Sequence, residues 1–171
     1  LLTLALVVEP TQVLARVMPG RGMFPDHKGA AAFIRSQNIK PGDILIAEDV
    51  LEQTYYLGRV DYWLISRKQA RLYVQRIDGV IRDFYTSTPV IDSGEQLQQV
   101  LDSSTGGRIF IIGSGENQKD ARRGMRGPSI SALLQSDRLE ELFLGSDGLT
   151  KVWRAKPSRA ETEPSTSHIE H

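Results

Sequence analysis

The chain has 171 residues, of which 40% are hydrophobic and 25% charged, and 21 Lys and Arg residues balance 21 Asp and Glu residues. This length suits about one domain, and the composition is that of an ordinary globular protein. A net charge of zero argues against electrostatic binding of nucleic acid, so we expect no nucleic-acid partner. The lack of cysteine excludes disulfides, thiolate catalysis and Cys-based zinc sites.

The chain begins with an apolar segment, LLTLALVV (residues 1–8), which is followed by Glu9 and Pro10. The segment is too short to cross a bilayer, which takes about 20 residues. No basic region precedes it, so it does not have the form of a signal peptide. Two interpretations stay open: a buried strand of the domain, or the end of a transmembrane helix.

Helices and strands are expected to alternate in the first half of the chain. Asp26 is a candidate N-cap for a helix with apolar residues at helical spacing. The run ILIA is typical of a strand that is covered on both faces, and Gly58 is expected to end the helix that follows. The expected elements here are helix 25–37, strand 43–48, helix 50–57 and strand 61–65.

The second half continues this alternation and ends in a hairpin. Residues 71–77 fit either a strand or a loop, and residues 78–92 are expected to be extended, with a turn at Asp78-Gly79. Ser93 is the candidate cap of the next helix, and Pro128 suits the first turn of the one after it. The remaining expected elements are helix 94–104, strand 108–112, helix 127–137 and a closing hairpin over 139–155 that turns at 146–148.

This order of elements predicts an α/β fold with a mostly parallel, Rossmann-like sheet flanked by helices and an antiparallel C-terminal hairpin. Residues 25–155 are expected to form a single α/β domain. Residues 156–171 have almost no core-forming side chain and are expected to be a disordered tail.

Two acids, Glu48 and Asp49, stand where the first strand should end, which is where open α/β sheets place their ligands. They could be paired carboxylates for acid/base chemistry or metal binding. Alternatively, one is a buried acid that accepts from backbone amides and the other is exposed. Arg59 and Asp61, around the second strand, could simply pair with them.

A glycine-rich loop, GSGEN (113–117), is expected after the strand 108–112. Its backbone amides could approach a phosphate, but the loop lacks the G-x-G-x-x-G pattern that leads straight into a helix. The basic run 119–127 could hold phosphates or anionic lipid head groups, or could be a solvated loop. The candidate ligand-facing residues are therefore Glu48, Asp49, Arg59, Gly113, Ser114 and Gly115.

No catalytic set is visible in the sequence. The three histidines, His27, His168 and His171, form no metal or catalytic pattern, and Ser114 lacks the frame of a nucleophile elbow. The aromatic cluster at 55–63 is interpreted as core and edge residues rather than a sugar-stacking platform. We therefore predict no catalytic residue, no metal site and no cofactor.

Four segments carry a resemblance to a known family. They are residues 25–64, DFYTSTPVIDSGEQLQQVL (83–101), GGRIFIIGSG (106–115) and LEELFLGSDGLTKVWRA (139–155). Together they resemble the soluble C-terminal domain of bacterial polytopic glycosyltransferases, the protein-mannosyltransferase-like membrane enzymes that use lipid-linked sugars. The family's YTGTP-like segment corresponds to 85–89, with Ser87 in place of glycine. Its GRDG…V hairpin corresponds to 145–152, with Ser146 in place of arginine.

The resemblance implies that residues 1–24 are the end of the last membrane helix and a connector. The domain would then lie on the extracytoplasmic (periplasmic) side of the cell membrane. Its partners would be the transmembrane part of the same polypeptide, and also the lipid-phosphate sugar or the acceptor. The family's catalytic acids lie between its early transmembrane helices, so no catalytic residue carries over and the segment 43–64 is a scaffold.

Two other functions stay open on the residues themselves. The chain could be a stand-alone α/β nucleotide- or sugar-binding protein or enzyme that uses the crevice between Glu48, Asp49 and residues 113–115. It could also be a non-catalytic interaction module.

Overall fold

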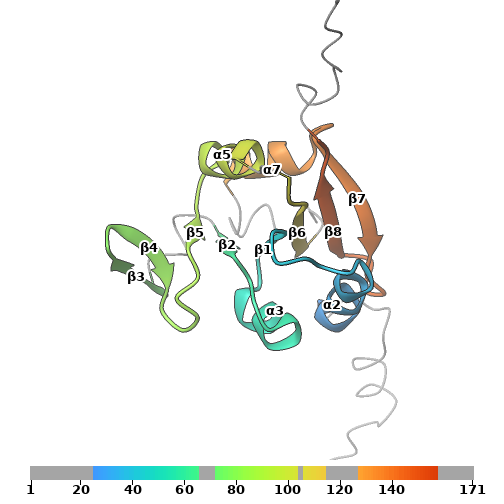
Figure 1. Ribbon diagram of the computed structural model, residues 1–171, viewed down its shortest axis with the longest axis horizontal. Coiled ribbons are helices and arrows are strands. Elements are labelled where there is room, and N and C mark those ends of the chain that lie inside the picture. The colour runs from blue at the N-terminus through green and yellow to red at the C-terminus, as the bar shows by residue number, and fades with distance from the viewer. Residues whose placement is uncertain (1–24, 66–71, 104–105, 115–126, 158–171) are drawn as a thin grey trace, which may run out of the picture.

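A computed structural model of the protein describes residues 25–65, 72–103, 106–114 and 127–157. They form a six-stranded sheet with helices on both faces and a separate two-stranded sheet (Figure 1). The helices are α2 (His27–Ser36), α3 (Val50–Leu57), α5 (Gly94–Ser103) and α7 (Pro128–Leu134). The strands are β1 (Ile44–Ala47), β2 (Tyr62–Leu64), β3 (Val74–Ile77), β4 (Val80–Asp83), β5 (Val90–Ile91), β6 (Ile109–Ser114), β7 (Leu139–Leu144) and β8 (Thr150–Ala155). The apolar N-terminal segment, the basic run up to residue 126 and the tail from residue 158 lie outside the described residues.

The large sheet has the strand order β5-β2-β1-β6-β8-β7. Its first four strands are parallel, and β8 is antiparallel to both β6 and β7. This confirms the predicted α/β class, with a mostly parallel sheet and an antiparallel closing hairpin. From β1 the chain adds β2 and β5 on one side, whereas β6 pairs with the other side of β1. The boundary between β1 and β6 is therefore a topological switch point.

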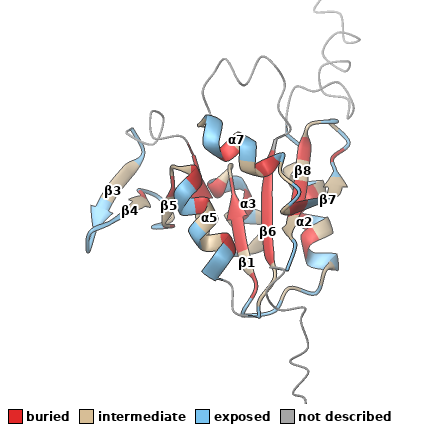
Figure 2. Ribbon diagram, turned by 90° about the horizontal axis from the view of Figure 1, so that it is seen from above, coloured by how far each residue is buried: buried red, intermediate tan, exposed pale blue. Residues whose placement is uncertain are grey.

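The core has two layers, one on each face of the large sheet. On β1, Leu45 and Ala47 pack with α2 and α3, whereas Ile46 packs with α5 and α7. The same alternation runs along β6, and the central strands are buried on both faces (Figure 2). Each fully buried Ile or Leu side chain contributes about 1.5–3 kcal/mol to folding, which accounts for the continuous apolar runs of these strands.

Three of the predicted helix ends are confirmed, whereas the helix expected over 127–137 ends earlier, at Leu134. Asp26 caps α2, because its Oδ1 accepts from the N–H of Gly29 at 2.9 Å. The Ser93 hydroxyl accepts from the N–H of Gln96 at 3.3 Å at the start of α5. Gly58, at φ +81°, ends α3 in the left-handed conformation that glycine adopts at little cost.

In two segments the structure goes beyond the expectations. It decides between two alternatives in the first and corrects the expectation in the second. Residues 74–77 are a strand, β3, that pairs with β4 around a turn at Asp78 and Gly79, both of which have positive φ. The strand β6 runs two residues further than expected, because Gly113 and Ser114 pair with β8. The prediction that these two residues lie in a loop was wrong, since their partner strand comes from the distant closing hairpin.

Candidate functional site

The switch point brings Glu48 and Gly113 together at the carboxyl ends of β1 and β6. The N–H of Glu48 donates to the carbonyl of Ile112 at 3.0 Å, and the indole N–H of Trp63 donates to the carbonyl of Glu48 at 2.8 Å. Glu48 is thus held by the strands on both sides of β1. Its position follows from the strand-end rule that the sequence suggested.

The Glu48 side chain lies against the backbone of β6 at Gly113. A Cβ added at residue 113 would lie 2.5 Å from Glu48 Oε2 and 2.7 Å from its Cδ. Glycine at this position therefore makes room for the carboxyl group. Carboxylate oxygens at this position can accept hydrogen bonds from sugar hydroxyls. Ser114 follows in β6, and Gly115 lies outside the described residues.

Asp49 begins α3 beside a histidine that the sequence did not single out. Its carbonyl accepts from the N–H of Gln53 at 3.0 Å, and its Oδ2 lies 3.9 Å from His27 Nδ1. His27 Nδ1 also lies 3.3 Å from Nε2 of Gln53, whose side chain is fully buried. Oε1 of Gln53 has no hydrogen-bond partner among the described residues. The three side chains come from α2 and the start of α3, a contact that no local pattern could predict.

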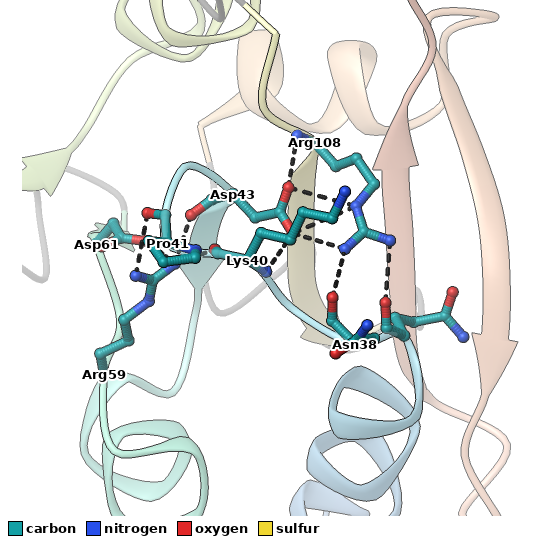
Figure 3. A network of polar contacts seen from close by, with 8 residues as sticks. Asn38, Lys40, Pro41, Asp43, Arg59, Asp61 and Arg108 are labelled. Atoms are coloured by element: carbon teal, nitrogen blue, oxygen red, sulfur yellow. Dashed lines mark hydrogen bonds and ion pairs between the residues drawn. The ribbon is translucent and has the colours of Figure 1, made fainter.

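Arg59 lies at the opposite, amino-terminal edge of the sheet (Figure 3). Its guanidinium donates to the carbonyl of Asp43 at 2.5 Å and to that of Pro41 at 3.4 Å. Asp61 lies 3.8 Å from this guanidinium and accepts from the N–H of Leu45 at 2.8 Å.

The expectation that Arg59 and Asp61 pair with the acids after β1 was therefore wrong. Because β1 and β2 are parallel, residues that precede β2 lie beside the start of β1 and not beside its end. Of the six candidate residues, the structure brings together Glu48 and Gly113, with Asp49 next in the chain and Ser114 next in the strand. It separates Arg59 from them by the length of β1.

The same amino-terminal edge holds an ion pair, between the buried Asp43 and the partly exposed Arg108, that the sequence analysis missed. Arg108 donates to Asp43 from its backbone N–H at 2.8 Å and from Nη2 at 2.6 Å, and it also donates to the carbonyls of Gln37 and Asn38 at 3.0 Å. Asp43 is only 4% exposed. Burial raises the pKa of Asp43, but hydrogen bonds from the Arg108 side chain and from the N–H groups of Lys40 and Arg108 outweigh it and bring the pKa to about 2. The pair joins the starts of β1 and β6 to the end of α2 (Figure 3).

A second polar cluster fastens the closing hairpin to α2. The N–H and hydroxyl of Ser146 both donate to Asp26 Oδ2 at 2.9 Å, and the N–H of Asp26 donates to Asp147 at 2.9 Å and to the hydroxyl of Thr150 at 2.8 Å. The hydrogen bond from the Ser146 N–H lowers the pKa of Asp26. Burial raises the pKa of Asp147, but hydrogen bonds from Thr150 and its neighbours outweigh it and lower the pKa. The turn between β7 and β8 is thus built around two carboxylates, those of Asp26 and Asp147, that accept from backbone amides.

A third cluster shapes the turn after β4. Asp83 Oδ2 accepts from the N–H of Tyr85 at 3.1 Å, and from the N–H and hydroxyl of Thr86 at 2.6 and 2.8 Å. The N–H of Asp83 donates to the carbonyl of Thr88 at 2.8 Å. Ser87, between Thr86 and Thr88, has φ +58°. This is a left-handed conformation that residues other than glycine adopt at a cost.

Comparison with known proteins adds no family to these observations. No protein-family profile, curated protein or solved structure matches this chain. Within the described residues, no three His, Asp or Glu side chains gather as ligands for a metal ion. No helix in the described ranges is long and apolar enough to cross a membrane. The fold and the site define an α/β domain with a carboxylate at its switch point.

Proposed function

We propose that the chain is an accessory domain, without catalytic residues of its own, of a membrane glycosyltransferase that transfers sugar from a lipid-phosphate donor. The observation that carries the proposal is the backbone of Ser87, whose φ is +58°. In the resembling family the same position of the YTGTP-like segment usually holds glycine. Glycine adopts this conformation without steric cost, so the local backbone of this chain suits the family's residue better than its own.

The second motif of the resemblance supports the same interpretation. The hairpin turn that corresponds to GRDG contains Asp147, which accepts from the N–H groups of Leu149 and Thr150 at 2.9 Å. Asp147 also accepts from the N–H of Asp26 at the start of α2. Both motifs therefore act in holding the domain together, as expected of a segment whose enzyme carries its chemistry elsewhere.

Under this proposal the domain lies on the extracytoplasmic side of the cell membrane, next to the transmembrane part of the same polypeptide. The catalytic acids and the lipid-phosphate sugar belong to that part. The domain then recognises the acceptor or the donor, or supports the folding of the whole enzyme.

The test is an immunoblot of fractionated source cells with an antibody raised against this chain. We expect a band several-fold heavier than 19.1 kDa in the membrane pellet. Immunopurified material from that pellet should transfer sugar from a polyprenyl-phosphate donor, whereas the isolated chain should not. A soluble band near 19.1 kDa would overturn the proposal.

A second candidate function is sugar binding at the switch point, where the carboxyl group of Glu48 lies against Gly113. Asp49→Ala should then weaken the activity of the parent enzyme while the domain stays folded. Asp137→Ala is the matched control, because Asp137 is an exposed acid in the turn between α7 and β7. Full activity of the Asp49→Ala enzyme, or equal loss in both variants, would remove the switch point from consideration.

A further inference from the structure

Exposed apolar side chains are concentrated on the β3–β4 hairpin. Nine large hydrophobic residues are exposed in the described part of the chain, and six of them lie between residues 72 and 85. These six are Leu72, Tyr73, Ile77, Val80, Phe84 and Tyr85. Surface apolar residues are normally scattered, and a gathered set indicates an interaction site.

The two faces of the hairpin differ. The register pairs Val74 with Asp83 and Ile77 with Val80. Val74 packs against the main core and Asp83 is buried, so the face that carries them is turned toward the domain. The opposite face, which we call the outer face, consists of Tyr73, Gln75, Ile77, Val80, Arg82 and Phe84.

The outer face is a continuous surface along both strands. Phe84 lies opposite Tyr73, because the N–H of Phe84 donates to the carbonyl of Tyr73 at 2.8 Å. Ile77 and Val80 lie opposite each other at the turn. The apolar residues thus occupy both ends of the face, with Arg82 between them. Both views place the hairpin beyond β5, the edge strand of the large sheet, and away from the four helices (Figures 1 and 2).

An isolated two-stranded sheet is marginally stable in water and gains nothing from an exposed apolar face. The inner face already holds the hairpin to the domain through Val74, which packs against the core layer on the side of α2 and α3. The composition of the outer face is therefore not explained by folding.

The charge of the outer face favours an anionic partner. The guanidinium groups of Arg76 and Arg82 donate to the carbonyls of Gly79 and Ser87 at 2.8 and 2.9 Å, and among the described residues no carboxylate pairs with either. The hairpin has two acids, the exposed Asp78 at its tip and the buried Asp83, which balance its two arginines. The outer face itself carries one cation and no acid.

We propose that the outer face of the β3–β4 hairpin docks on an anionic lipid surface. Tyr, Phe and aliphatic side chains are the residues that settle at the level of the head groups, and an arginine between them can meet lipid phosphates. Tyr73, Ile77, Val80 and Phe84 would enter the head-group layer, and Arg82 would lie against the phosphates. A membrane-side position of the domain follows from its own surface, without reference to any sugar chemistry.

The test uses the complete chain, which has no native cysteine, so that one introduced thiol gives one labelled position. Val80→Cys places an environment-sensitive fluorophore on the outer face, and Leu51→Cys places it on α3, where Leu51 is 47% exposed. Both proteins are titrated with vesicles of equimolar phosphatidylglycerol and phosphatidylcholine, and with vesicles of phosphatidylcholine alone. We expect a blue shift at position 80 with the anionic vesicles, and none at position 51.

Two variants measure separately the contributions of the arginine and of an apolar side chain to vesicle binding. Arg82→Gln should weaken partitioning onto anionic vesicles about fivefold, the effect of one basic residue near such a surface. Phe84→Ser should weaken it by at least as much, and Arg138→Gln, in the turn before β7, should not change it. Circular dichroism confirms that each variant is folded.

Three results would overturn the proposal: no vesicle binding, binding that leaves the label at position 80 unshifted, and an equal response to both vesicle types. The second of these would assign the binding to another segment, such as the apolar residues 1–8. Vesicle binding needs no sugar donor or transmembrane part. Its failure is therefore distinct from a failure of the glycosyltransferase proposal, which the cell-fraction immunoblot tests.

Discussion

The Asp43–Arg108 pair should contribute measurably to stability, and Asp43→Asn is the substitution that tests it. The pKa of Asp43 is lowered from 3.8 to about 2 in a side chain that is 4% exposed. At about 1.36 kcal/mol per pH unit, this corresponds to about 2 kcal/mol of folding free energy. Asn preserves the shape but removes the charge, and it leaves the Arg108 guanidinium without its partner. We expect a loss of about 2–3 kcal/mol at neutral pH.

The sign of the pH dependence follows from the direction of the shift. Because the pKa of Asp43 is lower in the folded state, its stabilisation is complete above the ordinary pKa of 3.8 and is lost as the pH falls toward about 2. The difference in unfolding free energy between the wild type and Asp43→Asn should therefore shrink over that acidic range.

The assay is urea unfolding followed by far-UV circular dichroism, at neutral pH and at a series of acidic pH values. Asp102→Asn is the matched control, because Asp102 pairs with Arg138 at 2.8 Å but is 55% exposed on its side chain. This exposed pair should be worth less than about 1 kcal/mol. Equal losses in the two variants, or a loss for Asp43→Asn that does not change with pH, would refute the reasoning.

Three further substitutions test the backbone, each by the same urea unfolding. Ser87→Gly should stabilise the chain by about 0.5–1 kcal/mol, because φ is +58° there; a destabilised variant would contradict this. Gly107→Ala should cost more than about 2 kcal/mol, since a Cβ would lie 1.9 Å from the carbonyl oxygen of Gly42, and backbone cannot yield easily. Gly113→Ala should cost less than Gly107→Ala, because the carboxyl group that it meets, that of Glu48, ends a flexible side chain; the reverse order would show that Glu48 is held rigidly.

The fold class was predictable because local pattern and burial agree in the central strands. The ILIA run of β1 and the IFII run of β6 are apolar at every position, as strands covered on both faces must be. The end of β6 was not predictable, since Gly113 and Ser114 belong to the strand only through their pairing with Lys151 and Thr150. Pairing between distant segments carries no local signal.

The candidate site also has a part that could be predicted from the sequence and a part that could not. Glu48 and Gly113 could be placed at one edge because each ends a parallel strand. The same rule, applied to residues that precede strands, would have put Arg59 at the other edge with Asp43 and Arg108. The sequence signal for this pair is an acid directly before one buried strand, β1, and an arginine directly before another, β6. The contact of His27 with Asp49 has no such signal, because it depends on how α2 packs beside α3.

Five aspartates of the domain are engaged by backbone amides and hold its turns and edges together, namely Asp26, Asp43, Asp61, Asp83 and Asp147. The carboxyl group of Glu48 lies over a glycine at the switch point, where the fold would place a ligand. Folding does not account for the outer face of the hairpin. These two surfaces lie on different sheets, so Asp49→Ala and Arg82→Gln should act additively if the two serve separate functions. Strong coupling between them in the parent enzyme would instead mean that lipid docking orients the switch point toward its substrate.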